Sequence, residues 1–411
     1  MIALLEAQRI VASLPLPTLA VEEIELEEAL GRVLAVAPES DLDLPPFDRV
    51  TMDGFAVRAA EAQAGATLRN AGGLAAGATA ARPLAPGEAL RIMTGAPLPP
   101  GADAVVPLEE AVSEGGSVRI GRTARPRQNV HARAVDLQRG ARPIAAGERI
   151  SAARVPLLAT LGCRRVAVRR RPRVELLATG DELVEPDVVP AGAQIRESNR
   201  FALAAQVASA AAQPFLRPIV RDDRELLRAA VEASLGGDVL LVTGGSSAGD
   251  FDFSGEVLAG LGGRRWFEQV RIKPGKPVLL FTLGERVVFC LPGNPVSSFV
   301  VFELLVRPLL ERLAGARACW PVPDELPLGE ALSAPPERDL LQVARIEADR
   351  PGRPRVDPVR WSGSGDLVAL ARANALVHLR QGAHAAAGSA ARVLALRSAW
   401  DELPRASEPP A

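Results

Sequence analysis

Residues 238–253, DVLLVTGGSSAGDFDF, join four consecutive apolar residues to a loop of glycine, serine and aspartate. An apolar run that stops at Gly-Gly is typical of a buried strand ending in a tight turn. The same order, an apolar strand and then a polar loop, occurs at 174–183, VELLATGDEL. Strands that are apolar throughout belong to parallel sheets covered by helices on both faces. We therefore expect an α/β sheet in this part of the chain.

The neighbouring sequence supports this expectation, because helical and extended segments alternate from residue 173 to residue 316. The helical segments are 197–213, 222–235 and 295–313, and the further extended segments are 214–220, 277–281 and 287–291. Such alternation predicts a mostly parallel α/β sheet. Ligands bind beyond the carboxyl ends of the strands in sheets of this kind. The polar loops that follow the strands are thus the first candidates for a binding site.

The rest of the chain shows other patterns of secondary structure. Residues 1–40 show helical periodicity, with a second helical stretch expected at 21–30. Residues 41–132 are rich in glycine, proline and short alternating segments, which is typical of a β-rich unit with many turns. Short apolar strands return in the region 323–404, where a small β-barrel is the natural arrangement.

Composition excludes several classes of function. The 48 Lys and Arg residues balance 49 Asp and Glu residues, which argues against a surface that binds nucleic acid or anionic membranes. Three cysteines suit neither a disulfide scaffold nor a zinc site. Three histidines and no tyrosine make histidine-based acid–base catalysis improbable. With no clean apolar span and no export signal apparent, we expect a cytoplasmic protein.

Two loops are candidates for binding an anion. Gly244, Gly245, Ser246 and Ser247 follow a buried strand and offer backbone amides and hydroxyl donors to a phosphate. In LPGNPVS, 291–297, Asn294 is placed to cap and Pro295 to begin the next helix, so its first amides would be directed out of the sheet. A plain tight turn and a simply well-capped helix remain the alternative interpretations.

Charged side chains collect around the same loops. IKPGKP, 272–277, places Lys273 and Lys276 in one turn of a chain that has far more arginine than lysine. Two solvated lysines beside a turn are the alternative to a site for a polyanion. Carboxylates near a phosphate usually indicate magnesium, although each one alone is more often a helix cap or a surface acid. The carboxylates in these loops are Asp181, Glu182, Asp222, Asp223, Asp250 and Asp252.

Seven motifs, in this order, resemble the molybdopterin molybdenumtransferases, that is, the bacterial MoeA family and the E domain of gephyrin. They are PPFDRVTMDGFAV at 45–57, IMTGAPLPPGADAVVP at 92–107, ATGDEL at 178–183, TGGSSAGDFDF at 243–253, IKPGKP at 272–277, LPGNPVS at 291–297 and SGSGDLVALARANAL at 362–376. The resemblance implies an elongated homodimer with a site shared between subunits. It also implies four parts: 1–40 with 133–172, the insertion 41–132, the α/β domain 173–316, and the barrel 323–404.

The reaction implied by the resemblance inserts the metal of molybdate into adenylylated molybdopterin and releases AMP, with Mg²⁺ as cofactor. The residues that match the family's oxyanion-binding positions are Lys273, Lys276, Ser297 and Ser364. Those that match positions used in catalysis or substrate handling are Asp53, Thr94, Glu182, Asp222 and Asp252, with Glu182 and Asp252 as metal ligands. Asp136, the Gly-Ser loop 244–247, Pro292, Gly293, Asn294 and Pro295 are expected to contact the substrate. The sequence does not separate molybdate from tungstate.

The sequence departs from the family pattern at three cationic positions. HARAVD, 131–136, keeps Asp136 but loses part of the usual positive charge, and Gln269 stands where a lysine is usual. An expected arginine is replaced by Gln342 or Val343, with Arg345 as a nearby substitute. Weaker oxyanion capture or a divergent paralogue would follow. The alternatives are a hydrolase of nucleotide pyrophosphates with the same α/β fold, and a pterin-binding scaffold without turnover.

Overall fold

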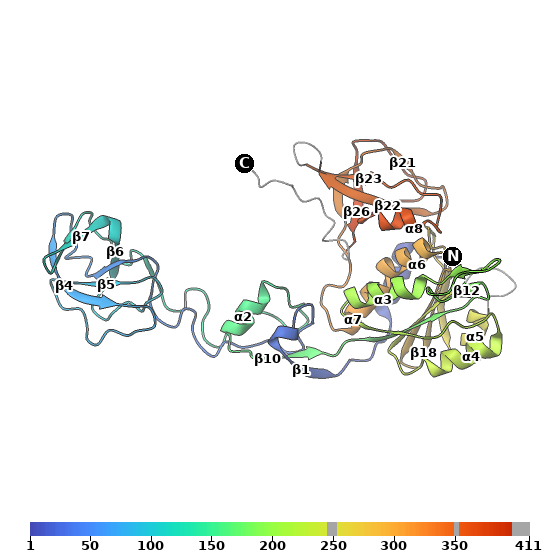
Figure 1. Cartoon of the computed structure of the whole chain (residues 1–411), viewed down its shortest axis with the longest axis horizontal. Coiled ribbons are helices and arrows are strands. Elements are labelled where there is room, and N and C mark those ends of the chain that lie inside the picture. The colour runs from blue at the N-terminus through green and yellow to red at the C-terminus, as the bar shows by residue number, and fades with distance from the viewer. Residues whose placement is uncertain (245–252, 349–352, 397–411) are drawn as a thin grey trace.

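The computed structural model describes residues 1–244, 253–348 and 353–396. The molecule is elongated, and its long axis runs from a β-rich unit at one end to an α/β unit at the other (Figure 1). A small unit lies between them, and the C-terminal strands form a fourth unit that lies over the helices of the α/β unit (Figure 1). We call these the distal, middle, α/β and C-terminal units. The fold is therefore a multidomain α/β fold with mixed sheets.

The α/β unit is built on one sheet, whose strand order within the described residues is β14-β11-β15-β19-β18-β16. The first four strands of this order are parallel, whereas β18 is antiparallel to both of its neighbours. The sheet is thus mixed, because the tight turn between β18 and β19 leaves no room for the crossover that a parallel pair needs. The strands are β11 (Arg173–Ala178), β14 (Gln213–Leu216), β15 (Val239–Thr243), β16 (Arg264–Gln269), β18 (Pro277–Leu283) and β19 (Arg286–Leu291).

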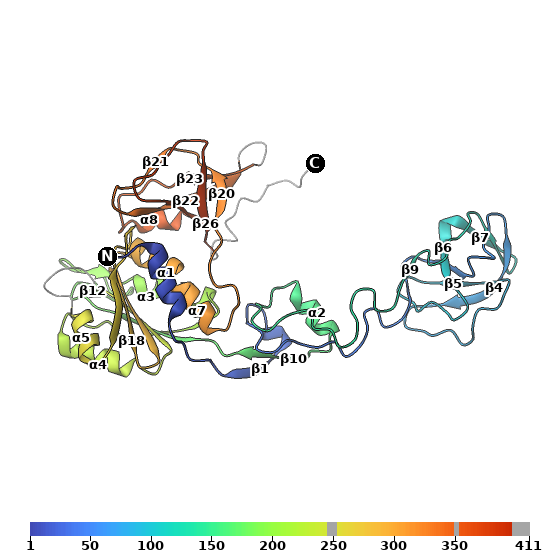
Figure 2. The same ribbon diagram turned by 180° about the vertical axis from the view of Figure 1, so that it is seen from behind.

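Helices cover both faces of this sheet, as the buried strands predict (Figures 1 and 2). Side chains alternate between the faces, so that Leu241 packs on one side with α1, α3, α6 and α7 while Leu240 packs on the other with α4 and α5. The helices are α1 (Leu4–Ser13), α3 (Asn199–Ser209), α4 (Arg224–Ala233), α5 (Ser254–Gly260), α6 (Pro295–Val301) and α7 (Arg307–Leu313). The helix expected at 295–313 is one helical stretch, with a π-helical segment, Phe302–Val306, between α6 and α7.

The middle unit corrects one expectation. Residues 21–30 are not an α-helix but the strand β1 (Val21–Glu25) and a 3-10 turn, Leu26–Glu28. β1 pairs antiparallel with β10 (Arg165–Arg169), and the cross-strand hydrogen bonds outweigh the helical propensity of the glutamates. The unit's small core joins residues such as Ala29 and Leu34 to Ile150 and Leu158, the last from α2 (Arg154–Thr160).

The distal unit is a sheet of order β6-β3-β5-β4-β8-β7 among the described residues. Its strands are β3 (Gly54–Val57), β4 (Thr67–Leu74), β5 (Glu88–Ile92), β6 (Ala104–Pro107), β7 (Ala111–Glu114) and β8 (Ser117–Ile120). The two chain segments that lead to it and from it pair as β2 (Arg49–Val50) and β9 (Val130–His131). The unit is therefore reached by one outgoing and one returning segment.

The C-terminal unit is a strongly curved sheet in which β22 pairs with β23 and β24, and β26 joins β24 to β20. A parallel bridge between Leu328 and Val356 brings the two edges together. Its elements are β20 (Asp324–Pro327), β21 (Leu332–Ser333), β22 (Asp339–Ala348), β23 (Pro354–Pro358), α8 (Leu367–Ala371), β24 (Ala375–Leu379), β25 (His384–Ala385) and β26 (Ala390–Ala395).

A short strand ties the α/β unit to the C-terminal unit. β17 (Ile272–Lys273) leaves the α/β sheet and pairs in parallel with the start of β22, where Ile272 faces Asp339. The chain then turns back through Gly275, whose φ of +102° suits glycine. A Cβ atom there would lie 2.7 Å from Val301 Cγ2 of α6, so only glycine fits between the loop and the helix.

No helix among the described residues has both the length and the apolar character needed to cross a membrane.

We predict that Gly275→Ala lowers the free energy of unfolding by more than the unfavourable backbone angle of the alanine alone would. The added methyl group combines an unfavourable φ with a clash against Val301, and overpacking of this kind costs about 1–3 kcal/mol. The matched control is Gly72→Ala, where φ is also +102° but no atom lies within 4 Å, so only backbone strain of about 1–3 kcal/mol is expected. Urea unfolding of both variants measures the difference. Equal losses of unfolding free energy would contradict the proposed close contact.

Candidate functional site

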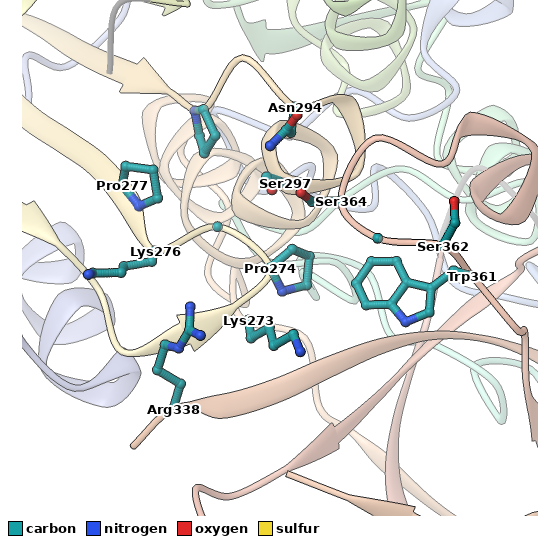
Figure 3. A pocket seen from close by; sticks show the side chains of 13 residues that line it. Lys273, Pro274, Lys276, Pro277, Asn294, Ser297, Arg338, Trp361, Ser362 and Ser364 are labelled. Atoms are coloured by element: carbon teal, nitrogen blue, oxygen red, sulfur yellow. The ribbon is translucent and has the colours of Figure 1, made fainter. Parts of the chain in front are cut away.

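A pocket of about 530 Å³ opens between the α/β unit and the C-terminal unit (Figure 3). Four segments form it: the loop that follows β17, the turn between β19 and α6, the residue before β22, and the loop 361–364. Its lining residues are Lys273, Pro274, Gly275, Lys276, Pro277, Pro292, Asn294, Ser297, Arg338, Trp361, Ser362, Gly363 and Ser364. We call it the cationic pocket, because three of these side chains are positive and none is acidic.

The lysines of the pocket are the only two in the chain, against 46 arginines. Both are exposed, and neither forms an ion pair within the part of the chain that the structure describes. Their side chains extend to opposite sides of the loop, with Lys273 on the side of Trp361 (Figure 3). Uncompensated charges in a concave site attract a small anion. The pairing of two lysines in one turn is thus part of a pocket and not of a plain solvated surface.

The turn LPGNPVS supplies the polar wall opposite the lysines. Pro295 occupies the first turn of α6, as expected, but the Asn294 side chain makes no capping hydrogen bond. Asn294 thus occupies the N-cap position, as expected, but its exposed side chain lines the pocket and does not bond to the helix. Ser297 lines the pocket from the first turn of α6 and is only 4% exposed.

The loop SGSGD reaches the same place from the C-terminal unit. The Val296 backbone N–H at the start of α6 donates to the Ser364 carbonyl oxygen at 3.0 Å. Asp366 shapes the loop, because its carboxylate accepts from the Ser362 N–H at 3.0 Å, the Ser362 hydroxyl at 3.1 Å and the Ala369 N–H at 2.9 Å. The hydrogen bond from Ala369 is the main reason that the pKa of Asp366 lies below its usual range, and the Ser362 bonds lower it further.

Three lining residues, Arg338, Trp361 and Ser362, were not singled out by the sequence analysis. The only sequence signal for Ser362 was its place in the SGSGD motif. Arg338 and Trp361 flank strands of the C-terminal unit, where charged and aromatic residues are common, so local patterns could not distinguish them. Only the packing of β17 against β22 brings Arg338 to the lysines.

A second polar region lies at the carboxyl edge of the α/β sheet, where the loops after β11, β15 and β19 meet. Gly244 has a φ of +88°, and a Cβ atom there would lie 2.2 Å from the Thr179 carbonyl oxygen. Asn199, at the start of α3, donates to the Gly293 carbonyl oxygen at 2.7 Å. The Thr179 hydroxyl and the Asn199 amide oxygen are buried and have no hydrogen-bond partner in the described residues. Buried polar atoms without partners are costly unless a ligand satisfies them.

Carboxylates gather beside this edge. Burial is the largest cause that raises the pKa of Asp222, and the nearby charges of Glu182 and Asp181 raise it too, against a hydrogen bond from the Asp181 backbone N–H that lowers it. Asp223 is a helix cap, because its side chain accepts from the Leu226 N–H at 2.8 Å. Within the described ranges, no three His, Cys, Asp or Glu side chains are grouped so that they could hold a metal ion.

Part of the predicted phosphate loop lies outside the described ranges. Gly245, Ser246, Ser247, Asp250 and Asp252 lie outside the described residues, between Gly244 and Phe253. The predicted metal ligand Asp252 is among them, and only Glu182 of that pair is described.

Asp53 and Thr94 lie together but far from the cationic pocket of the same chain. Both belong to the distal unit, where the Asp53 carboxylate accepts from the Thr94 N–H and hydroxyl, each at 2.7 Å. The backbone hydrogen bond is the main cause that lowers the pKa of Asp53. Asp136 is exposed on the segment that returns from the distal unit. One chain therefore does not bring these three residues to Lys273 (Figure 1).

The positions where family cations are missing also lie outside the pocket. Gln269 is the last residue of β16. Gln342 is buried and donates to the Val359 carbonyl oxygen at 2.8 Å, and Val343 is part of the core. Arg345 donates to the Arg372 carbonyl oxygen at 3.1 Å and does not line the pocket. Arg345 is therefore not the substitute that the sequence analysis considered.

Comparison with protein-family models covers nearly the whole chain. Residues 2–162 match the MoeA N-terminal region (domain I and II), and residues 175–312 match a probable molybdopterin binding domain. Residues 325–396 match the MoeA C-terminal region (domain IV). The three matches follow one another in the order of the structural units.

Individual proteins are similar over most of their length. The molybdopterin molybdenumtransferase of Nostoc sp. is 36% identical over 73% of this chain and 71% of its own length. That of Bacillus subtilis is 33% identical over 94% of both chains. Among solved structures, the molybdopterin biosynthesis MoeA protein from Pyrococcus horikoshii has a TM-score of 0.79 at 30% identity, over 96% of this chain and 99% of that one.

We predict that Asp366→Asn loosens the SGSGD loop in a pH-dependent manner. An amide oxygen accepts the Ser362 and Ala369 bonds more weakly than a carboxylate does, so the variant should have a lower unfolding free energy at neutral pH. Because the folded-state pKa lies below 3.8, the wild-type advantage is complete well above that value and is lost as the pH falls through the folded-state pKa. Urea unfolding of both proteins from neutral to acid pH measures the gap. A gap that stays constant would contradict the assigned role of the charge.

Proposed function

The chain belongs to the molybdopterin molybdenumtransferase family and acts in molybdenum cofactor biosynthesis, and from this premise we propose that it transfers the metal of molybdate to adenylylated molybdopterin with release of AMP. The observation that carries the proposal is the cationic pocket, in which Lys273, Ser297 and Ser364 line one cavity although they come from three separate motifs. These are the residues that match the family's oxyanion-binding positions.

The oxyanion is held by charge and by hydroxyl donors. Lys273 and Lys276 supply positive charge without an acidic neighbour in the pocket, and Ser297 and Ser364 supply groups that donate to oxygen. Charge-assisted hydrogen bonds are the strong ones, which suits a doubly charged substrate such as molybdate. The pocket binds the oxyanion, and the polar carboxyl edge beside it orients the adenylylated molybdopterin.

The adenylylated substrate binds along the carboxyl edge of the sheet, from the β11 loop to the β19 turn. Thr179 and Asn199 offer buried polar atoms that have no partner in the described residues, and Pro292, Gly293 and Pro295 form the adjoining turn. Gly244 allows the loop after β15 to approach the Thr179 backbone closely, as a cradle for the pyrophosphate requires. The expected contacts of Gly245, Ser246 and Ser247 with the phosphates stay a prediction, since these three residues lie outside the described ranges.

Magnesium fits the carboxylates beside this edge. Mg²⁺ is commonly bound by one or two protein carboxylates together with substrate phosphates. Glu182 and Asp222 lie close enough for the charge of Glu182 to raise the pKa of Asp222, and they are hard oxygen donors of the right kind. Glu182 and Asp252 would hold the ion, with Asp222 next to it. When bound, the ion neutralises charge on the bridging phosphates.

The active assembly is a homodimer in which the distal unit of one subunit reaches the cationic pocket of the other. The separation of the Asp53–Thr94 pair from the pocket of its own chain supports this arrangement. In a twofold dimer each distal unit meets the partner's pocket, so both sites are equivalent. Asp53, Thr94 and Asp136 then contribute to the site from the second subunit.

The two other readings of the sequence are not favoured. A pyrophosphate hydrolase needs only the α/β unit, whereas the similarity to molybdopterin molybdenumtransferases extends over the distal, middle and C-terminal units as well. The relatives from Nostoc sp. and Bacillus subtilis are named as transferases, which favours turnover over a scaffold.

We predict that the purified chain, given adenylylated molybdopterin, Mg²⁺ and molybdate, releases AMP and activates an apo-molybdoenzyme. Lys273→Met should lower the rate about tenfold or more, because it removes a charged donor worth about 1.5–3 kcal/mol. AMP release and reconstituted enzyme activity are the two measurements. AMP without activation would instead indicate a hydrolase, and substrate binding without AMP a scaffold. Chelation of Mg²⁺ should abolish both signals.

We predict that two impaired variants complement each other if the site is shared. Asp53→Asn lacks a functional distal unit and Lys273→Met lacks a functional pocket, so a mixed dimer contains one intact site. Random exchange makes half of the dimers mixed, and activity should recover to about a quarter of the wild-type value. Lys273→Met mixed with Lys276→Met is the control, because every pocket then carries a defect. No recovery after subunit exchange would contradict the shared site.

A further inference from the structure

The cationic pocket contains a third positive side chain, which belongs to none of the seven sequence motifs. Arg338 lines the pocket together with Lys273 and Lys276, and its guanidinium lies beside the loop that carries both lysines (Figure 3). Its side chain is partly buried and makes no ion pair or hydrogen bond within the described part of the chain. Although Glu337 and Asp339 flank it in the chain, no acidic side chain lines the pocket or pairs with Arg338 in the described residues, so its donors are available for a ligand.

The backbone explains why Arg338 faces the pocket. Asp339, the next residue, begins β22, and its N–H donates to the Arg271 carbonyl oxygen at 2.9 Å beside β17. The Asp339 carboxylate is occupied elsewhere, at 2.9 Å from both His378 Nε2 and the Gln381 N–H. Arg338 itself closes a turn just before the strand, where its N–H donates to the Pro335 carbonyl oxygen at 3.4 Å. Arg338 lines the pocket, whereas the Asp339 side chain is bound within the C-terminal unit and does not pair with the arginine.

The family pattern places a cation near position 342 of β22, but Gln342 and the nearby Arg345 both make contacts outside the pocket. The Gln342 amide is bonded to backbone carbonyl groups inside the C-terminal unit. Arg345 forms an ion pair with Glu347 at 3.3 Å and donates to a backbone carbonyl oxygen, outside the pocket. Arg338 is the remaining cation that β22 and its flanking residue present to the lysines.

We propose that Arg338 binds the tetrahedral oxyanion substrate and replaces, from a different position, the cation that the family pattern places within the strand. This inference rests on the proposed function for the identity of the oxyanion. The planar guanidinium donates two parallel hydrogen bonds to two oxygens of one anion, which an ammonium group does not. Arg338 therefore contributes both charge and orientation, and Lys273 and Lys276 hold the remaining oxygens.

The test compares molybdate binding by the full-length wild type, Arg338→Ala, Arg338→Lys and Arg345→Ala, using isothermal titration calorimetry. Arg338→Ala should raise Kd about tenfold or more, since a charged hydrogen bond is lost. Arg338→Lys should recover only part of the affinity, because it restores charge without the two parallel donors. Arg345→Ala is the matched control, which removes the same charge from β22 outside the pocket and should leave Kd unchanged.

A chemical readout checks that the site affected is the cationic pocket. Because the chain has only two lysines, an amine-selective acetylating reagent modifies only them and the N-terminal amine, which serves as an internal reference. Molybdate should protect Lys273 in the wild type but not in Arg338→Ala at the same concentration. Thermal unfolding midpoints equal to that of the wild type show that the variants are folded.

The outcomes separate this inference from the proposed function. Equal Kd and equal protection in the wild type and Arg338→Ala would overturn the role of Arg338, even if AMP release proceeds normally. Loss of binding in Arg338→Ala, in a protein whose wild type releases no AMP, would support Arg338 as an oxyanion ligand and reject the proposed reaction. A wild type that binds no molybdate at millimolar concentration would overturn the inference outright.

Discussion

The contact between the Gly275 loop and α6 is the constraint on which the site depends. The loop crosses the helix so closely that a single methyl group would meet Val301, while β17 on its other side is hydrogen-bonded to β22 of the C-terminal unit. The loop is therefore fixed on one side by the Val301 side chain and on the other by backbone pairing. Because the lysines sit at its two ends, their positions depend on how the α/β unit and the C-terminal unit are packed together.

This arrangement holds like charges near one another without acids to balance them. Lys273, Lys276 and Arg338 bring three positive charges to one pocket, and the packing of α6 and the β17–β22 pairing hold their backbone in place. A bound dianion balances these charges and gains charge-assisted hydrogen bonds. Affinity for the oxyanion and stability of the packed units are consequently linked, since a ligand that binds only the folded state stabilises it.

The sequence predicts what depends on local pattern. Apolar strands such as 239–242 and the Pro295 helix start were evident, because burial on both faces and a proline at the first helical position leave clear signatures. The helix expected at 21–30 is wrong, since pairing with β10 depends on residues more than a hundred positions away. Arg338 is not evident from the sequence for the same reason. It lies near the lysines only because β17 pairs with β22, and no spacing of residues along the chain indicates that pairing.

The middle unit has a topology that affects the order of assembly. Its small core needs Leu34 and Leu158 together, although the whole distal unit lies between them in the chain. Closing a long flexible loop costs conformational entropy, and this cost falls when the intervening segment has already folded and paired its ends as β2 and β9. The folded distal unit thus brings the two segments of the middle unit close together through the β2–β9 pair. A substitution that unfolds the distal sheet is therefore expected to weaken the middle unit, which connects the distal unit to the α/β unit.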